Sequence, residues 1–481
     1  MNQPTLLPPG GLLIGERLIT DASGGVIKHV NPTTGKPQAD LALAGEQEVD
    51  QAVAAARSGY RAWWAMSAPA RRDALHRLIV LVEEHSDELT RIGALESGVP
   101  VAGGTGLALE WMRYYAGWAD KLDGETVPIQ GGLDYVLPEP YGVIGVIIPW
   151  NSPLTACAMT VIPALAAGNA VVLKPPELAP FAAIRLGQLA LRAGLPAGTL
   201  TVIPGDGRAG DALVRHPEVA KVSFTGGGST AQKVIEATAP MTKPLMLELG
   251  GKSANIVFSD ANLDAAVPLA AQQAFSLTGQ GCCLPTRLIV HDDVYDEVIR
   301  RLVQVTEQLQ VGDPLEATTA IGPVINAGAC ERILGVIDRA ATQREGTIVA
   351  GGKRMGGALA DGYFIQPTVF GDVLPDSELS QKEVFGPVLA VSRFRTEEQA
   401  IDIANGTAFG LAAYVHTNDL GRAHRLASRL EAGNVSVNGF YGMTPNAPFG
   451  GYKASGFGRT GGRVGLTEFL QQKNVYINLS E

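Results

Sequence analysis

Hydrophobic residues recur every three to four positions in two stretches near the start of the chain, residues 49–60 and 75–89. This period is that of an amphipathic helix with one face against a core. Beyond them the pattern changes, and Gly142–Ile148 is a continuous apolar run between Pro140 and Pro149. Such a run, bounded by prolines, is typical of a buried strand. The helical apolar positions are Val49, Val53, Ala56, Tyr60, Leu75, Leu78, Ile79, Val82 and Leu89.

Short strands and helices alternate after this run, with short loops between them. The alternation predicts a parallel, doubly wound sheet, and a second alternating region follows Gly251. We therefore expect an α/β protein with two doubly wound, Rossmann-like domains, residues 1–122 with 141–250 and residues 251–460. The expected strands are Ala170–Lys174, Leu200–Ile203, Lys221–Phe224, Asn255–Phe258, Leu288–Val290 and Ala390–Phe394, and the expected helices are Pro180–Ala193, Ala209–Arg215 and Ala231–Ala237.

Two further segments fit neither domain. Val127–Leu137 and Asn474–Leu479 have the composition of strands. Such strands often leave a domain to pair with another subunit, and an ordinary edge hairpin is an equally good interpretation of the pattern. We predict that residues 123–140 and 465–481 form a small β extension used for oligomerisation.

Composition narrows the classes of protein that fit. The chain has 481 residues, 46% of them hydrophobic and 18% charged, as in a globular protein of two or three domains. A net charge of −10 argues against a nucleic-acid partner. Four scattered cysteines indicate a reducing compartment, and no Cys/His cluster has the spacing of a metal site. Because neither a signal-peptide pattern nor a membrane-length apolar stretch is present, we expect a cytoplasmic protein without a membrane partner.

The most informative candidate chemistry is a cysteine and a glutamate. Cys282 follows Gly279-Gln280-Gly281, where glycines let a substrate approach the thiol. Glu248 lies among leucines, and apolar surroundings raise the pKa of a carboxyl and suit it to act as a base. A nucleophile and a base are what covalent catalysis needs. Taken singly, each has a plainer interpretation, because cysteine is commonly a buried apolar residue and a glutamate before glycines commonly caps a loop.

Four turns that follow strands are candidate contacts to a cofactor or substrate. Gly205–Gly210 matches the dinucleotide fingerprint but lacks the acidic residue expected about twenty positions later. Gly226–Gly228 opens a helix, where free amides attract phosphate; a plain flexible turn fits equally well. Lys174 and Glu177 follow a strand and could hold a ribose, or could simply pair in water. Asn151 could stabilise an oxyanion, although Asn near Pro is common in turns.

These and further motifs occur in the same order as in the aldehyde dehydrogenase superfamily, which the chain resembles over essentially its whole length. No single motif is specific, but seven in order leave little room for coincidence. Tyr115–Lys121 is similar to the branch that acts on betaine aldehyde and on fatty or aromatic aldehydes. The seven matches are Pro149–Asn151, Lys174-Pro175 with Glu177, Phe224–Gly226, Glu248–Lys252, Gly279–Cys282, Glu383–Pro387, and Pro448–Lys453 with Ser455-Gly456.

The resemblance implies NAD(P)-dependent, non-phosphorylating oxidation of an aldehyde to its carboxylic acid. Cys282 would attack the carbonyl, and its backbone amide and the Asn151 side chain would hold the oxyanion. Loss of hydride to the nicotinamide would leave a thioester, and Glu248 would activate the water that releases the acid. Lys174 completes the expected catalytic set.

The resemblance also implies how the cofactor is held. Lys174 and Glu177 would bind the adenosine ribose, Glu383 the nicotinamide ribose, and Phe385 would pack near the ring. A carboxylate at Glu177 repels a 2′-phosphate, so we expect NAD, with NADP as a second candidate. The expected cofactor-binding residues are Ile147, Pro149, Trp150, Lys174, Glu177, Gly207, Phe224, Thr225, Gly226, Gly227, Leu249, Gly250, Glu383 and Phe385.

The sequence departs from the family pattern at three places. Gly227 and Gly228 stand where the family usually has a serine, so pyrophosphate binding would rely on backbone amides. Cys283–Thr286 differs from the small residues usual after the nucleophile. Ser152 stands where many members carry an aromatic residue, which would widen the substrate tunnel. The expected pocket, which has no obvious arginine and favours bulky apolar or aromatic aldehydes, consists of Ser152, Met159, Tyr441 and Met443.

Three other functions fit the sequence less well than aldehyde oxidation does. A CoA-acylating dehydrogenase generally lacks the glutamate found here at Glu248. A non-catalytic structural or binding protein on the same fold would be expected to have lost Cys282 or Glu248. A cysteine hydrolase needs no nicotinamide, so the cofactor motifs count against it. The sequence does not separate a homodimer from a homotetramer.

Overall fold

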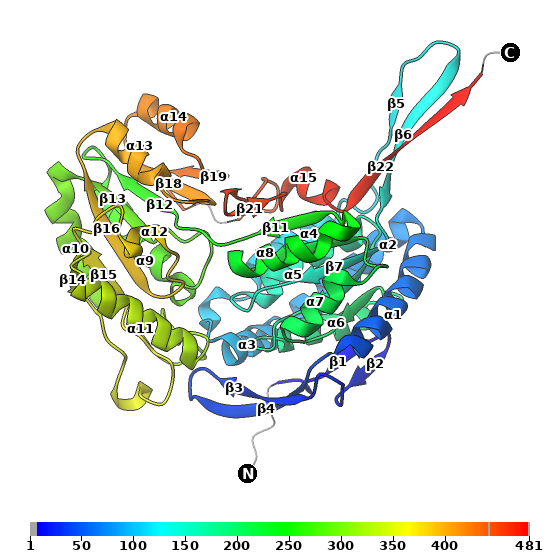
Figure 1. Cartoon of the computed structure of the whole chain (residues 1–481), viewed down its shortest axis with the longest axis horizontal. Helices are drawn as coiled ribbons and strands as arrows, with labels where there is room; N and C mark the ends of the chain where they lie inside the picture. Colours follow the sequence, from blue (N-terminus) through cyan, green and yellow to red (C-terminus); the bar gives the residue numbers. More distant parts are fainter. Residues whose placement is uncertain (1–6, 441–442, 480–481) are drawn as a thin grey trace.

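The computed structural model describes residues 7–440 and 443–479, and it contains two large sheets covered by helices and a small third sheet that projects from them (Figure 1). The α/β fold class expected from the alternation is confirmed. The predicted domain boundaries stay a prediction, and one short strand, β21 (Gly456–Phe457), crosses them by pairing with the first sheet.

The first sheet has eight strands, and its five central strands are parallel. Each strand and helix predicted between Ala170 and Ala237 is present within a few residues of its expected bounds. The edges are antiparallel, where β1 joins β9 and where β21 joins β11. The order is β2 (Arg17–Ile19), β1 (Leu12–Ile14), β9 (Leu200–Val202), β8 (Ala170–Lys174), β7 (Val143–Ile147), β10 (Lys221–Thr225), β11 (Leu245–Glu248) and β21.

Helices cover both faces of this sheet. Strand β7 lies at its centre, and for this reason its residues are apolar throughout. Ile144 and Val146 belong to one hydrophobic core, and Val143 and Ile147 belong to the other. Successive side chains of a strand point to opposite faces, so a central strand needs apolar residues at every position. The helices are α1 (Glu46–Ala65), α2 (Ala68–Glu84), α3 (Ser86–Ser97), α4 (Gly106–Ala116), α5 (Pro153–Ala166), α6 (Phe181–Arg192), α7 (Gly207–Arg215) and α8 (Gly228–Thr238).

The second sheet has seven strands, parallel except for the pair β14 and β15. Its order is β14 (Thr347–Ala350), β15 (Thr368–Gly371), β16 (Val388–Phe394), β13 (Arg287–His291), β12 (Ala254–Val257), β18 (Ala412–His416) and β19 (Asn434–Val437). The helices here are α9 (Leu263–Phe275), α10 (Tyr295–Gln308), α11 (Ala327–Thr342), α12 (Glu378–Gln381), α13 (Glu397–Asn405) and α14 (Leu420–Arg429), and α15 (Gly462–Thr467) leads back to the third sheet.

The third sheet corrects one sequence expectation. Val127–Leu137 was expected as one strand, but it contains a turn between β5 (Glu125–Val127) and β6 (Gly132–Pro140). Pro128 cannot donate a ladder hydrogen bond, and Gly131 has φ +74°, so the chain reverses there. The C-terminal β22 (Leu470–Asn478) pairs antiparallel with β6 along its whole length.

The stretch 75–89 is a second correction, because it is not one helix. Helix α2 ends at Glu84, and α3 begins at Ser86. His85 between them has φ −103° and ψ 17°, outside the helical region. Leu89, expected to share a face with Leu75, therefore packs from a separate helix.

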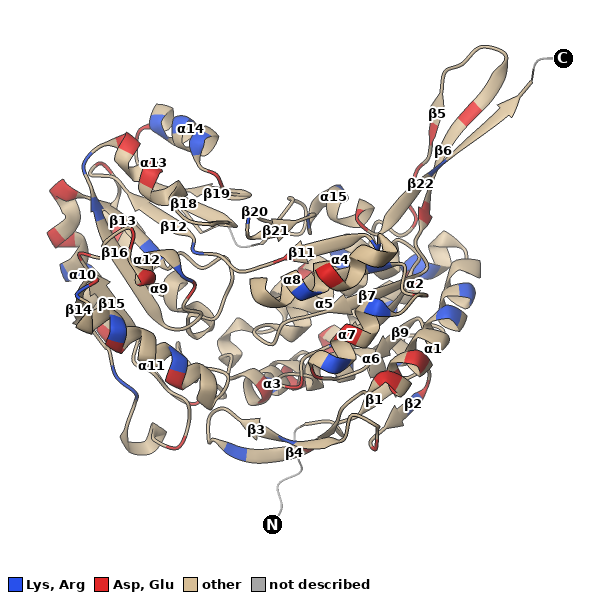
Figure 2. Cartoon of the chain, in the orientation of Figure 1, with Lys and Arg blue, Asp and Glu red and all other residues tan. Residues whose placement is uncertain are grey.

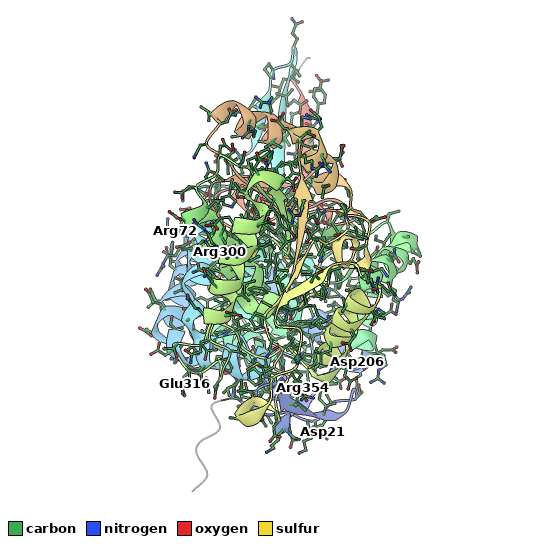
Figure 3. All side chains as sticks on the ribbon, turned by 90° about the vertical axis from the view of Figure 1, so that its left-hand side faces the viewer. Asp21, Arg72, Asp206, Arg300, Glu316 and Arg354 are labelled. Atoms are coloured by element: carbon green, nitrogen blue, oxygen red, sulfur yellow. The ribbon has the colours of Figure 1, made fainter. Side chains whose placement is uncertain are left out.

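Charged residues cover the outer helices in mixed sign (Figure 2). On α10, for example, Arg300 and Arg301 both pair with Glu297. A view turned by 90° shows side chains filling the space between the layers, with the labelled charged residues Arg72 and Glu316 at the left edge (Figure 3). Within the described residues, no helix is long and apolar enough to cross a membrane.

Candidate active site

The loop that carries Cys282 is held in an uncommon backbone conformation. Leu277 and Thr278 have φ of +51° and +58°, which residues other than glycine rarely adopt. Gly279 has φ +70°, and a Cβ at this position would overlap the backbone of Gly386. The Gly279–Cys282 and Glu383–Pro387 motifs are therefore packed against each other, and Gly279 is needed both for its φ and for this close approach.

Cys282 is partly exposed, whereas Cys283 is buried. The Asn151 side-chain amide donates a hydrogen bond of 2.7 Å to the carbonyl of Gln280, two residues before Cys282. The Tyr414 hydroxyl donates a bond of 2.9 Å to the carbonyl of Cys283. Asn151 is thus placed beside the cysteine loop, and one of its two N–H groups is committed to holding that loop.

The two neighbouring thiols are electrostatically linked. A hydrogen bond with Cys283, together with burial, raises the pKa of the Cys282 thiol. The same hydrogen bond lowers the pKa of Cys283. Acidity alone would favour Cys283 as the nucleophile, but Cys283 is only 7% exposed. Access instead favours Cys282, because it is the more exposed residue of the two.

Glu248 is the last residue of β11, and its carboxylate is buried. Neither carboxylate oxygen has a hydrogen-bond partner. Burial raises the pKa of Glu248 well above its usual value, and nearby Arg459 partly opposes this rise. A buried carboxyl without partners and with a raised pKa is suited to take a proton from water near neutral pH.

A cavity of about 710 Å³ opens at the carboxyl ends of the first sheet, between α7 and α8. Ten of the fourteen expected cofactor residues line it. They are Ile147, Pro149, Trp150, Lys174, Glu177, Gly207, Phe224, Thr225, Gly226 and Gly227. Glu46, Ile148, Arg208, Thr230 and Lys233 also line it and are not among the expected residues. Arg208 lies within the Gly205–Gly210 turn and Thr230 follows the Gly226–Gly228 turn, so both could have been found from those positions.

Lys174 lies in this cavity rather than in the one that contains Cys282. Its ammonium donates to the carbonyls of Gly205, at 2.6 Å, and Pro175, at 3.2 Å. Burial lowers its pKa to about 8. Lys174 is therefore positioned to contact a ligand in the cofactor cavity. It does not line the cavity that contains Cys282.

The N-terminus of α8 offers the clearest test of whether a dinucleotide fits. Gly227 caps this helix and has no side chain that could accept from its first amides. A Cβ on Gly227 or Gly228 would meet no atom within 4 Å, so the space above them is open. Free amides at a helix N-terminus bind anions such as a pyrophosphate. The residues present therefore fit an NAD-type cofactor.

The other four expected cofactor residues, Leu249, Gly250, Glu383 and Phe385, do not line this cavity. Glu383 accepts a hydrogen bond of 3.0 Å from the amide of Gly251. A Cβ at Gly250 would overlap the Glu383 carboxylate, so a larger residue there would displace this side chain. The Phe385 ring meets Trp150 edge-on, with centroids 5.3 Å apart. Through this ring contact, Phe385 reaches the wall of the cofactor cavity from the second sheet.

A second cavity, of about 310 Å³, contains Cys282, Cys283 and Asn151 in its wall. Ser152 and Met443 line it as expected. Met159 does not line it, but packs against the hydrophobic cluster that includes Cys282. Tyr441 lies outside the described residues. The aromatic residues Tyr414, Phe440 and Phe449 also line this cavity and are not among the expected pocket residues, although Phe449 lies inside the motif Pro448–Lys453.

The remaining lining residues are Val99, Gly103, Gly104, Leu107, Thr155, Ser276, Leu277, Gly281, Leu284, Ala412, Asn434, Ser436, Thr444, Ala447 and Pro448.

The sequence of this chain matches a known protein family and its members. The family model described as the aldehyde dehydrogenase family matches residues 19–475. An aldehyde dehydrogenase of Enchytraeus buchholzi is 39% identical over 476 residues, covering 97% of this chain and 95% of that protein.

Several solved protein structures are also similar to this chain in sequence and in fold. PnpE from Pseudomonas sp. WBC-3 has a TM-score of 0.96 at 38% identity, with 98% of both chains covered, and PnpE has also been solved in complex with nicotinamide adenine dinucleotide. A betaine aldehyde dehydrogenase from Staphylococcus aureus, in complex with NAD+, has a TM-score of 0.94 at 33% identity, covering 98% of this chain and 95% of that one. The chain therefore belongs to the aldehyde dehydrogenase family.

Proposed function

We propose that this protein oxidises an uncharged, apolar or aromatic aldehyde to its carboxylic acid with NAD, through a thioester on Cys282. The observation that carries the substrate class is the cavity around Cys282. Every residue that the structure places in its wall is uncharged, and aromatic or aliphatic side chains such as Leu107, Phe440 and Phe449 contribute to it. A substrate carboxylate or ammonium would lose its hydration there without finding a partner, which disfavours charged aldehydes.

Covalent chemistry begins at Cys282. Its thiolate attacks the aldehyde carbon and forms a thiohemiacetal. The Cys282 backbone amide and the second N–H of Asn151 are the donors available to the oxyanion. Asn151 is already oriented by its bond to Gln280, so little reorganisation is needed when negative charge develops.

Hydrolysis then depends on Glu248. In the ionised form it accepts a proton from water, and the hydroxide attacks the thioester carbon and releases the acid and the thiolate. Because its pKa is raised, Glu248 is a stronger base than an exposed carboxylate. When bound, NAD supplies the hydride acceptor. The cavity at α8 would hold its pyrophosphate, and Lys174 and Glu177 its adenosine ribose.

The projecting sheet supports an oligomer, either a homodimer or a homotetramer. Apolar side chains on it are exposed, among them Leu133, Leu137, Tyr476 and Ile477. Among the described residues, β5 and β22 are the outer strands of this sheet, and a second copy could extend the sheet at either side. Light scattering of the intact chain and of an Ile477→Glu variant would test this assignment. All four cysteines are free thiols, which supports the proposed cytoplasmic location.

The decisive experiment combines a substrate panel with one variant. Apolar, aromatic and carboxylate-bearing aldehydes are assayed for NADH formation, with NAD and NADP in parallel. Glu248→Gln should give a burst of about one NADH per active site and then very slow turnover, because the thioester forms but is not hydrolysed. Full steady-state turnover of Glu248→Gln would contradict the mechanism. Acceleration by free coenzyme A would favour the CoA-acylating alternative instead.

A further inference from the structure

A smaller cavity opens from the wall of the substrate cavity. It has a volume of about 70 Å³ and lies between α3, the start of α5 and the start of α6. Its wall shares residues with the wall of the substrate cavity, so the two spaces adjoin. The shared residues are Val99, Gly103, Gly104, Ser152 and Thr155. This space, which we call the side cavity, therefore lies directly beside the cavity that contains Cys282.

The side cavity exists because α3 carries the small residues Gly93, Ala94 and Ser97 where it borders this space. Leu89, Gly93 and Ser97 are spaced by four and lie on the same face of the helix. A Cβ built on Gly93 would meet no atom within 4 Å. Ala94, beside it, also lines the space. Larger residues at Gly93 and Ala94 would fill the gap between α3 and α5, and these small ones leave it open.

The chemistry of the side cavity is apolar. Every residue that the structure places in its wall is uncharged, and Leu89, Val99 and Leu154 contribute aliphatic surface. Two of its hydroxyl groups already have partners. Ser97 donates to the carbonyl of Gly93 at 2.8 Å, and Thr105 pairs with Ser86 at 2.7 Å. An apolar group would therefore fit this space better than a charged one.

We propose that the side cavity is a second substrate subsite, which takes an apolar branch of an aldehyde whose main chain occupies the cavity beside Cys282. Ser152, at the junction, determines whether the branch can enter, because a large side chain there would close the opening. The inference rests on the proposed aldehyde oxidation and narrows its substrates to aldehydes with two apolar arms. It also gives a role to the small residue found where an aromatic one was expected from the family.

The test compares aldehydes that differ by one aromatic ring. The pairs are 3-phenylpropanal with 3,3-diphenylpropanal, and the corresponding butanals and pentanals, so that the branch point is moved along the chain. The quantity measured is the ratio of kcat/KM for the diphenyl aldehyde to that for the monophenyl aldehyde. For at least one chain length we expect a wild-type ratio of about ten or more.

Two variants then locate the effect. Gly93→Leu fills the side cavity from α3 without touching the residues around Cys282, and should lower the ratio about tenfold while the monophenyl rate is kept. Ser152→Phe should lower it by closing the junction. Gly335→Leu, a helical glycine of α11 whose Cβ would meet only the end of the Arg339 side chain, is the matched control and should leave the ratio unchanged.

Two results would overturn the subsite. One is that no chain length favours the second ring, and the other is that Gly93→Leu leaves the ratio unchanged. Failure of the proposed function would look different, because the monophenyl aldehydes would then not be oxidised with NAD by the wild-type protein. Turnover of the monophenyl aldehyde by each variant also shows that the variant is folded.

Discussion

Glu248 and Arg459 face each other across Gly450. A Cβ on Gly450 would lie 2.8 Å from a carboxylate oxygen of Glu248 and 2.8 Å from Cδ of Arg459, so these two atoms are separated by no more than twice that distance. Arg459 donates to the carbonyls of Gly451 and Gly458 and makes no hydrogen bond to Glu248. The arginine thus provides positive charge beside the base without occupying its oxygens.

The first prediction follows from this pair. Arg459→Met removes the charge that opposes the rise in the Glu248 pKa, so that pKa should rise further. Because Glu248 acts as a base only when ionised, hydrolysis should slow several-fold at neutral pH and recover as the pH is raised. The measurement is the pH profile of steady-state NADH formation. Glu468, held by Lys221, and Cys283 also face this region and both act in the opposite sense, raising the Glu248 pKa.

Two controls separate charge from structure. Arg459→Lys keeps the positive charge and should leave the pH profile close to that of the wild type. Arg300→Met removes an exposed arginine of α10 and should have no effect. An unchanged profile in Arg459→Met would show that the arginine does not act on the base.

The second prediction concerns the two cysteines. Cys282→Ala should abolish oxidation while the cofactor still binds, and Cys283→Ala should keep substantial activity. Because the Cys283 contact raises the pKa of Cys282, its removal should make Cys282 ionise at lower pH. The rate of alkylation by iodoacetamide, measured against pH, would show that shift. An inactive Cys283→Ala beside an active Cys282→Ala would reverse the assignment.

The third prediction is a gain of cofactor affinity. Gly227 has φ −79° and ψ 146°, which any residue adopts, and a Cβ there meets no atom within 4 Å. Gly227→Ser adds a hydroxyl at the N-cap of α8, where it can donate to the pyrophosphate, and NAD should bind up to about tenfold more tightly. Fluorescence titration of NAD measures this. Gly356→Ser, at another open N-cap glycine outside the cavity, should bind NAD like the wild type, and an unchanged Gly227→Ser would contradict the prediction.

The fourth prediction concerns cofactor choice. Glu177 lines the cavity with Arg208 and Lys233, so removing its charge leaves cations able to meet a 2′-phosphate. Glu177→Ser should lower the ratio of kcat/KM for NAD to that for NADP by about ten- to a hundredfold. The ratio is compared within each variant, and Glu236→Ser, on the exposed side of α8, is the control. Equal use of both cofactors by the wild type would remove the role given to Glu177.

The fifth prediction concerns stability. Lys252 is buried, its ammonium has no hydrogen-bond partner, and burial lowers its pKa to about 7. Its unfolded value is about 10.4, so the cost of burying it is full below pH 7 and fades as the pH rises toward 10. Lys252→Met should therefore stabilise the fold by about 1–4 kcal/mol at neutral pH and much less near pH 10.

Thermal unfolding measured from pH 6 to 10 checks the sign of this effect. The exposed Lys28→Met should show no such pH-dependent gain. A loss of stability in Lys252→Met at neutral pH would show that the lysine has a partner within the folded protein that offsets its burial.

The parts of the fold predicted best from the sequence are those whose cause is local. Strand β8 has its expected bounds because an apolar run ending in Lys174-Pro175 carries its own start and stop. The turn at Pro128–Gly131 and the break at His85 were missed because the strand and helix periods continue across them. Similarly, Phe449 could be found from its motif, whereas Tyr414 and Phe440 line the substrate cavity from segments with no local signal.

By itself, the sequence determined which chemistry was available. The order of its glycine, cysteine and glutamate motifs predicted a nucleophile, a base and a cofactor site, because backbone conformations that need glycine and groups that react cannot be replaced freely. Only the tertiary structure decided which groups share a cavity. It placed Lys174 apart from Cys282, brought Arg459 to Glu248, and set Ser152 in the walls of both the substrate cavity and the side cavity. These relations depend on how distant elements pack, and packing distances are not encoded in any short stretch of residues.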